Sequence, residues 1–187
     1  METAMDERKK QLDEYIDKCI QYHGHLCMGQ VLGVKLAVKG LELAQPKGEK
    51  DLIVIVENDR CIADAILTLT GTRLGRRSFK FKDYGRMAAT FWNVATNKAY
   101  RLHTAFSGKI NPQDKNEVRN ILYLPDEKVI AWKEVAVNLK KTEMPGPPQK
   151  VVECIKCKER IFDGKDTETP DGPVCNACLS GSYYSYM

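Results

Sequence analysis

Two pairs of closely spaced cysteines near the C-terminus constrain the fold of this chain more than any other feature. Each pair has the form C-x-x-C, and 17 residues separate the two pairs. The four thiols are Cys154, Cys157, Cys175 and Cys178. Each C-x-x-C turn presents two thiolates to one ion, and zinc takes four tetrahedral ligands, so the spacing predicts one closed, structural zinc site. Residues 151–187 offer too little core to fold alone, so we expect their folding to be coupled to metal binding.

Two other interpretations of these cysteines stay open at this point. In the first, the four thiols form two disulfides or stay free and buried. In the second, they hold an iron–sulfur cluster. The chain has seven cysteines and no secretory signal sequence, which argues against a disulfide framework. The dense cysteine spacing of bacterial ferredoxins is absent, so we consider an iron–sulfur cluster a much weaker interpretation than zinc.

A proline-rich stretch divides the chain. Residues 144–150 contain three prolines and a glycine, which prevent regular structure and stiffen the connection. We therefore expect an α+β domain over residues 1–143, a linker over 144–150, and a four-cysteine zinc finger, either a ribbon or a treble clef, over 151–187. A chain of 187 residues is long enough for one domain with its own core plus a small appendage.

The first domain shows helical patterns before most of its strand patterns. Apolar residues at helical spacing predict a helix over residues 6–20, a second after the HGHLCMG segment, and a third over 61–69 that ends at Gly71. Gly29 and Gly33 weaken the helix propensity of the second helix, but they permit close packing against another backbone or a ligand.

Strand patterns dominate the rest of this domain. The strand-like segments are 51–57, 78–82, 87–95, 100–106 and 135–139. A turn at 96–98 between two of them argues for antiparallel pairing. Together these patterns are typical of an α+β fold in which helices pack on one face of a mostly antiparallel or mixed sheet.

The composition is that of a folded globular protein. Hydrophobic residues make up 43% of the chain and charged residues 29%. No apolar run approaches the roughly 20 residues that span a bilayer, so we expect a cytoplasmic protein with no membrane association. Residues 151–187 carry 4 basic and 6 acidic side chains. This acidic balance argues against direct nucleic-acid binding by the finger, because such binding requires neutralisation of phosphates.

A second group of metal-ligating residue types lies near the N-terminus. Within nine residues the chain places Cys19, His23, His25 and Cys27. If the first helix continues through His23, then Cys19 and His23 lie one turn apart on the same side. Gly24 allows the chain to turn so that His25 and Cys27 converge on them. Cys27 then lies at the start of the second helix, where the helix dipole favours a thiolate.

The start of the third helix supplies further members of this group. Cys61 opens that helix, and Asp64 follows on the same face, where it would support the site. A lone cysteine on an apolar helix face is as often core filler, which applies best to Cys19. For His103, in a predicted strand, we favour a structural role.

A basic segment follows the third helix. Its six cations are Arg73, Arg76, Arg77, Lys80, Lys82 and Arg86. An anion or a phosphate is one possible partner. The alternation of the lysines with Phe79 and Phe81 favours instead the solvated face of a half-buried strand. The glycines nearby do not have P-loop spacing.

Two of these motifs together resemble the FmdE-like family, which takes its name from a component of formylmethanofuran dehydrogenase. The first motif is C-x3-H-G-H-x-C-x-G-x3-G over residues 19–33, and the second is C-x-x-D-A-I-x4-G over residues 61–71. The appended four-cysteine unit is similar to treble-clef fingers of the TraR/DksA type. The chain departs from the family pattern at Met28, where proline is usual, and at Thr72, where many members carry a cysteine that would be another potential ligand.

The resemblance implies a homodimer, an α+β domain, and a Cys/His cavity that holds a second transition-metal ion of unknown identity. The ligand set that we carry forward is Cys19, His23, His25, Cys27 and Cys61. The family name refers to an operon association with a molybdenum or tungsten enzyme that reduces carbon dioxide to a formyl group. The chain shows no ferredoxin-like cysteine run and no dinucleotide-binding fingerprint, so we do not expect it to catalyse that reaction alone.

Three functions follow from these motifs. The first is a metal-binding accessory protein or subunit that serves a formylmethanofuran dehydrogenase-type oxidoreductase through partner subunits. The second is a small enzyme in which Cys27 or Cys61 is a nucleophile or redox thiol, or holds a catalytic metal, beside His25. The third is a regulatory protein that acts through its zinc finger. The stiff linker would position the finger. One possible position is against the other subunit of the dimer.

Overall fold

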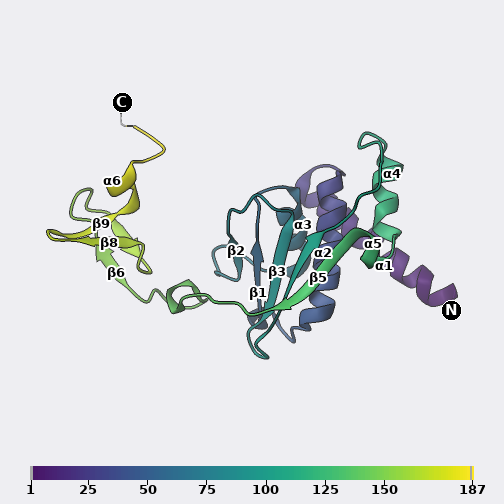
Figure 1. Ribbon diagram of the computed structural model, residues 1–187, viewed down its shortest axis with the longest axis horizontal. Helices are drawn as coiled ribbons and strands as arrows, with labels where there is room; N and C mark the ends of the chain where they lie inside the picture. Colours follow the sequence, from purple (N-terminus) through teal and green to yellow (C-terminus); the bar gives the residue numbers. More distant parts are fainter. Residues whose placement is uncertain (1, 186) are drawn as a thin grey trace. The chain divides into compact units, whose positions relative to one another are not determined.

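The computed structural model describes residues 2–185 and 187, and the side chains of residues 5–185 and 187. The chain forms two compact units, Met1–Val137 and Asn138–Met187 (Figure 1). The stretch predicted as a linker, residues 144–150, falls within the second unit. Each unit is described by itself below.

Three helices form one layer of the first unit. They are α1 (Glu2–His23), α2 (Met28–Ala44) and α3 (Cys61–Thr70). The helices after the HGHLCMG segment and after residue 60 begin and end close to the predicted bounds. Gln45 and Gly71 end α2 and α3 in the left-handed conformation, with φ of 48° and 66°. This is a common way to terminate a helix, because it turns the last carbonyls away from the helical path.

A five-stranded mixed sheet forms the other layer. Its strands are β1 (Leu52–Val56), β2 (Phe79–Phe81), β3 (Ala88–Asn93), β4 (Lys98–Thr104) and β5 (Ile130–Val135). Their order is β2-β1-β3-β4-β5. Only β1 and β2 run parallel, and the remaining pairs are antiparallel. The α+β class with a mixed sheet is therefore confirmed.

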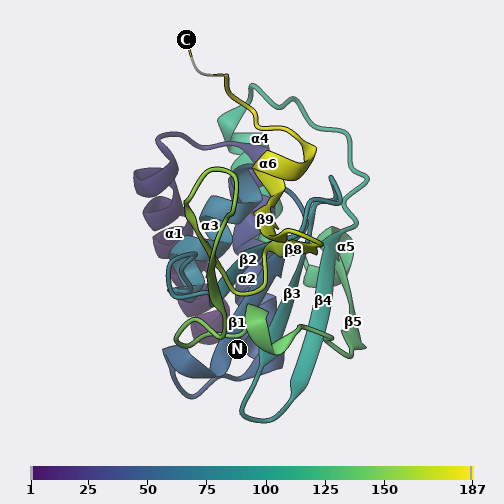
Figure 2. The ribbon, with the colours of Figure 1, turned by 90° about the vertical axis from the view of Figure 1, so that its left-hand side faces the viewer.

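The helices pack against one face of this sheet (Figure 2). The second helix lies between α3 and strands β3 and β4, and its glycines make that position possible. A Cβ atom at Gly33 would lie 2.6 Å from Cβ of Ala65 in α3, and one at Gly40 would lie 2.4 Å from the Phe91 ring in β3. These glycines therefore reduce the helix propensity of α2 but allow it to pack closely against both α3 and β3.

The last strand differs from its predicted bounds. Val135 is its final residue, and Val137 and Leu139 lie outside it. The reason is the length of the neighbouring strand: Val135 pairs with Ala99, near the start of β4, so no backbone partner is left beyond it. Alternating valines alone did not reveal where the neighbour ends.

The segment between β4 and β5 contains helices that the sequence patterns did not predict. They are α4 (Lys115–Asn120), the 3-10 turn η2 (Ile121–Tyr123) and α5 (Asp126–Val129). Asp114 caps α4 by accepting hydrogen bonds from the backbone of Asn116 and Glu117. A further 3-10 turn, η1 (Glu49–Asp51), precedes β1.

The second unit contains short strands and one short helix. After the 3-10 turn η3 (Lys141–Glu143) come β6 (Val151–Glu153) and β7 (Arg160–Phe162), which pair with each other, and β8 (Asp166–Thr169) and β9 (Gly172–Cys175), which form a hairpin. Helix α6 (Asn176–Ser180) ends the unit. Its core is small, because of its described residues just Cys154, Ile161 and Val174 are buried.

Within the described residues, no helix is both long enough and apolar enough to cross a membrane.

Candidate metal centres

Three predicted ligands converge where α1 gives way to α2. His23 is the last residue of α1, His25 lies in the connecting turn, and Cys27 is the N-cap of α2. Gly24 has φ of +97°, which a side chain would disfavour, and this turn brings the three together. Their ligand atoms all lie within 4.8 Å of one another. The rings of His23 and His25 are tilted against each other at a centroid distance of 4.7 Å.

Asp64 in α3 orients the first of these histidines. His23 Nδ1 donates to Asp64 Oδ2 at 2.8 Å, and this leaves Nε2 as the free ring nitrogen, 4.0 Å from Cys27 Sγ. In metalloproteins a carboxylate commonly holds a ligating histidine in this way, because it fixes the tautomer and ring orientation. Asp64, which the sequence predicts as a supporting residue, thus contacts one of the candidate ligands.

Cys61 lies beside this group as the first residue of α3. Burial raises the pKa of its thiol, and a hydrogen bond with the Cys27 thiol raises it further. The absent side chain of Gly29 makes room for it, since a Cβ there would lie 2.7 Å from Cys61 Cβ. Cys61 is thus close to Cys27, but it is outside the group of three whose ligand atoms are mutually close.

Two further side chains hold the backbone of this region, and sequence reasoning did not identify either. Gln30, fully buried in α2, donates from Nε2 to the Cys61 carbonyl oxygen at 2.7 Å, while its Oε1 has no hydrogen-bond partner. Lys115 in α4 donates from Nζ to the Leu26 carbonyl oxygen at 2.9 Å. Gln30 occupies a variable position of the first motif, and Lys115 is 89 residues away in sequence from the residue that it contacts.

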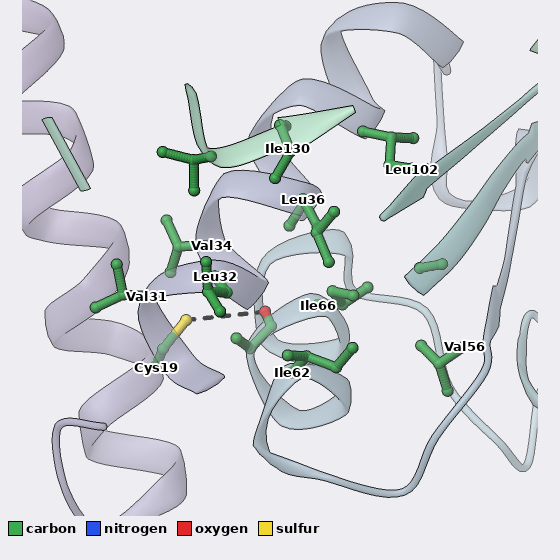
Figure 3. Packing of buried hydrophobic residues seen from close by; sticks show 14 of the residues in the cluster. Cys19, Val31, Leu32, Val34, Leu36, Val56, Ile62, Ile66, Leu102 and Ile130 are labelled. Carbon is green, nitrogen blue, oxygen red and sulfur yellow. Dashed lines mark hydrogen bonds between the residues drawn. The ribbon is translucent and has the colours of Figure 1, made fainter. Parts of the chain in front are cut away.

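Cys19 is not brought into this group. It is fully buried among core residues of α2 and α3, and its thiol points to the Ala65 carbonyl oxygen at 3.8 Å (Figure 3). Burial raises the pKa of this thiol to about 12, so the uncharged thiol is strongly favoured there. Of the two interpretations of Cys19, the structure corresponds to core filler, because this part of α1 faces its neighbouring helices.

The contacts of His103 and of the basic segment agree with the structural interpretations that we favour for them, a structural histidine and a solvated strand face. His103 lies on β4 with an exposed side chain, and its Nδ1 is 3.3 Å from the Ala131 carbonyl oxygen of the neighbouring strand. In the basic segment, Arg76 pairs with Glu49 and Arg86 pairs with Glu57. The first is an ion pair between two exposed side chains, whereas Glu57, the partner of Arg86, is buried.

A cysteine in place of Thr72, where the resemblance implies a further potential ligand, would not reach the first centre. Thr72 follows the C-terminal end of α3, whereas Cys61 is at its N-terminal end. Ten helical residues separate these ends by about 15 Å. Met28 is the first helical residue of α2, a position where proline is well tolerated, so methionine there is compatible with the same helix start.

The four C-terminal cysteines form a second group. Their Sγ atoms all lie within 4.8 Å of one another. Cys154 follows β6, Cys157 ends the turn after it, Cys175 ends β9, and Cys178 lies in α6. Backbone amides also point at the sulfurs: the Cys175 amide donates to Cys154 Sγ, and the Cys178 amide donates to Cys175 Sγ, both at 3.4 Å.

The thiols of this group compete for protons. Backbone hydrogen bonds from Cys157 and Cys175 lower the pKa of Cys154 to about 6, whereas the hydrogen bond with Cys175 and burial raise the pKa of Cys178 to about 12. In the absence of a cation, therefore, the group cannot hold four thiolates at neutral pH. A divalent cation removes this conflict, which is why four clustered cysteines suit a metal.

Comparison with known proteins shows both a similar fold and a matching sequence family. A solved structure, described as a tungsten formylmethanofuran dehydrogenase FmdE-like protein from Syntrophus aciditrophicus, superposes with a TM-score of 0.63 and 23% sequence identity, over 93% of this chain and 95% of that one. This likeness shows the fold.

A curated protein of Archaeoglobus fulgidus, described as a probable S-adenosyl-L-methionine-binding protein, is 30% identical over 89 residues, which are 44% of this chain and 24% of that protein. The chain thus spans about a quarter of the length of this relative. The sequence profile described as "FmdE, Molybdenum formylmethanofuran dehydrogenase operon" matches residues 22–148. That range covers well over half of the chain, and the protein therefore belongs to the FmdE family.

Proposed function

We propose that this protein is a metal-binding accessory protein that serves an oxidoreductase of the molybdenum or tungsten formylmethanofuran dehydrogenase type. Its first unit would hold a transition-metal ion on His23, His25 and Cys27. The observation that carries this proposal is the convergence of these three donors within 4.8 Å, with Asp64 fixing the ring of His23. The operon in the family description supports the enzyme class.

The donor set fits a borderline metal ion. Two neutral imidazoles and one thiolate suit zinc and similar transition metals better than they suit magnesium or calcium, which prefer oxygen. Asp64 supplies the carboxylate that ligating histidines usually contact, and Cys27 is the N-cap residue of α2. A bound ion of this kind supplies Lewis acidity to a ligand.

The chain's own residues would prepare this centre before any ion arrives. Asp64 holds His23 with Nε2 toward Cys27, and Lys115 holds the carbonyl of Leu26 between the other two ligands. Gln30 fixes the first turn of α3, and with it Cys61. A preorganised ligand set of this kind lowers the conformational cost of metal binding.

The second unit would hold zinc in a closed four-thiolate site. Its four sulfurs use every tetrahedral position, so its role would be to fold the unit. The second cysteine pair comes from the start of a helix, which favours a treble clef over a ribbon. The linker end also contacts this unit, because the Gln149 amide donates to Asp163 and Lys150 pairs with Asp166.

Metal analysis of the purified full chain tests both centres together. We expect two equivalents of metal in the native protein and one equivalent in a variant that carries both His25→Ala and Cys27→Ser. His103→Ala is the matched control, because it removes an exposed histidine away from the three donors and should leave two equivalents. An unchanged metal content in the double variant would contradict the first centre.

The homodimer rests on the family resemblance, and the positioning of the finger rests on the proline-rich linker; both belong to the same proposal. Light scattering of the full chain measures the oligomeric state, and a monomer at all concentrations would contradict the dimer.

A second candidate function, a thiol-dependent enzyme, is favoured by one observation. Cys27, His23 and Asp64 form a thiol–imidazole–carboxylate series, with steps of 4.0 Å and 2.8 Å. In such a series the imidazole takes the thiol proton and the carboxylate orients the ring. The same three groups therefore suit a nucleophile when no metal is bound.

Selective alkylation separates the two functions. If Cys27 holds metal, iodoacetamide should modify it slowly in the protein as purified and quickly after chelation. If Cys27 is a nucleophile, it should react quickly in both states. Mass spectrometry of the peptide that contains Cys27 gives the rates.

A further inference from the structure

We infer that the first-unit metal centre is completed by a singly charged anion from solution, such as a carboxylate. This inference rests on the proposed metal centre and adds the class of its exchangeable ligand. Its evidence is the number of donors, their exposure, and the charge around them.

The donor count is three. Among the residues that the structure describes, no further cysteine, histidine or carboxylate joins the group in which all ligand atoms are mutually close. Asp64 is already committed, because it accepts the hydrogen bond from Nδ1 of His23, the ring nitrogen that faces away from Cys27. Zinc sites with three protein ligands keep their fourth position for water or a substrate.

The three donors are also accessible. His25 is exposed and Cys27 is partly buried, whereas the side chain of His23 is only 14% exposed. The C-terminal group differs, since four sulfurs surround one point there and Cys154 is fully buried. A dissolved ligand can therefore reach the first centre from the His25 side, whereas the second centre has no position to offer.

The charge around the first centre favours a monoanion. A divalent ion with two neutral imidazoles and one thiolate keeps a single positive charge. The Asp64 carboxylate, in the first turn of α3 and in contact with His23, offsets part of it from behind the ring. The N-terminal ends of α2 and α3 lie here as well, since Gly29 contacts Cys61 across the two helices. The first turn of α2 has neither an acidic residue nor a side-chain cap, so its positive end is uncompensated. The Lys115 ammonium on the Leu26 carbonyl oxygen adds to this field.

Cobalt(II) substitution of the full chain tests the inference, because the visible bands of cobalt change when a ligand is exchanged. Sodium azide is the probe, sodium acetate is the carboxylate competitor, and sodium perchlorate at equal ionic strength is the non-coordinating control. The spectrum of the variant with His25→Ala and Cys27→Ser isolates the finger and is subtracted. We expect a saturable band shift with azide, its reversal by acetate, and no shift with perchlorate.

The outcomes distinguish this inference from the proposed function. If the chain binds a single equivalent of cobalt, in the finger, the proposed metal centre itself is wrong. If it binds two equivalents and azide changes nothing, the centre exists but is closed, and the anion inference is overturned.

Cys61→Ser checks the one side chain that is placed to close the site. We expect the azide response to persist in this variant with the same saturation. A response that appears only after the substitution identifies Cys61 as the fourth ligand and overturns the inference. His25→Ala alone replaces the double variant if the latter does not fold, because His25 is exposed and lies outside the core.

Discussion

Asp64 shows how one carboxylate sets the chemistry of a neighbouring ring. Its contact with His23 fixes which nitrogen faces Cys27, and an amide in its place keeps the shape but loses the charge. We therefore expect Asp64→Asn to weaken metal binding at the first centre by about ten- to one hundred-fold. Competition with a chromophoric chelator measures this affinity. Asp59→Asn removes an exposed carboxylate nearby and should leave the affinity unchanged; equal losses in both variants would point to bulk charge instead.

Glu57, at the carboxyl end of β1, is a buried carboxylate held by two arginines. Burial raises its pKa, but Arg101 and Arg86 outweigh burial and hold that pKa below the ordinary value of 4.5. Arg101 binds it through two hydrogen bonds of 2.6 and 2.8 Å. A carboxylate with a lowered pKa contributes its full stability above pH 4.5 and loses it as the pH falls through the folded pKa.

We expect Glu57→Gln to lower the free energy of unfolding by about 3 kcal/mol at neutral pH, because it leaves two arginines without their shared partner. The difference from the native protein should shrink as the pH falls below 4.5. Urea titrations followed by tryptophan fluorescence measure this, since Trp92 and Trp132 both lie in the first unit. Glu134→Gln, at an exposed position on β5, is the control. A constant difference across the pH range would show that Glu57 acts through packing alone.

At the scale of elements, the crossing of α2 and α3 determines where the first centre lies. The two helices approach so closely at Gly33 that a Cβ atom there would lie 2.6 Å from Ala65 Cβ and 3.0 Å from the Ile62 backbone. Backbone atoms cannot move away from such a clash as easily as the end of a flexible side chain can. We expect Gly33→Ala to destabilise the first unit by about 1 to 3 kcal/mol despite its better helix propensity.

Gly75→Ala is the matched control for this substitution, because a Cβ at Gly75 meets nothing within 4 Å. Its effect should stay within about 0.5 kcal/mol. Thermal unfolding followed by tryptophan fluorescence compares the two variants. Equal or higher stability of Gly33→Ala would contradict the close crossing.

The same elements show how far the sequence predicts this structure. Periodicity located α2, α3 and the strands, because those signals are local. The spacing of Cys19 and His23 placed both on one side of α1, yet Cys19 faces the core while His23 reaches the turn. The residue at which a helix extends beyond the protein core depends on the helices packed against it. No local sequence pattern encodes that packing. Lys115 and Gln30 were missed for the same reason: each acts on a backbone carbonyl distant in sequence.

At the scale of the whole molecule, the two units would hold their proposed metals by different means. The first centre lies at the ends of helices that belong to a large apolar core, and α1 and α2 bring its candidate ligands together. Among the described residues of the second unit, Cys154, Ile161 and Val174 alone are buried, so its fold would depend on metal held by its four cysteines. Binding free energies of structural zinc reach about 10 to 16 kcal/mol at neutral pH, which far exceeds what so small a core supplies.

Stepwise chelation of the full chain should therefore separate the units. A weak chelator removes the metal from the accessible three-ligand centre and leaves both units folded. A strong chelator then removes the finger metal and unfolds residues 138–187 alone, because the first unit keeps its apolar core. Metal content gives the two steps, protease cleavage reports the second unit, and tryptophan fluorescence reports the first. The variant with His25→Ala and Cys27→Ser should show only the second step. Loss of the tryptophan signal together with the finger metal would mean that the units do not fold independently.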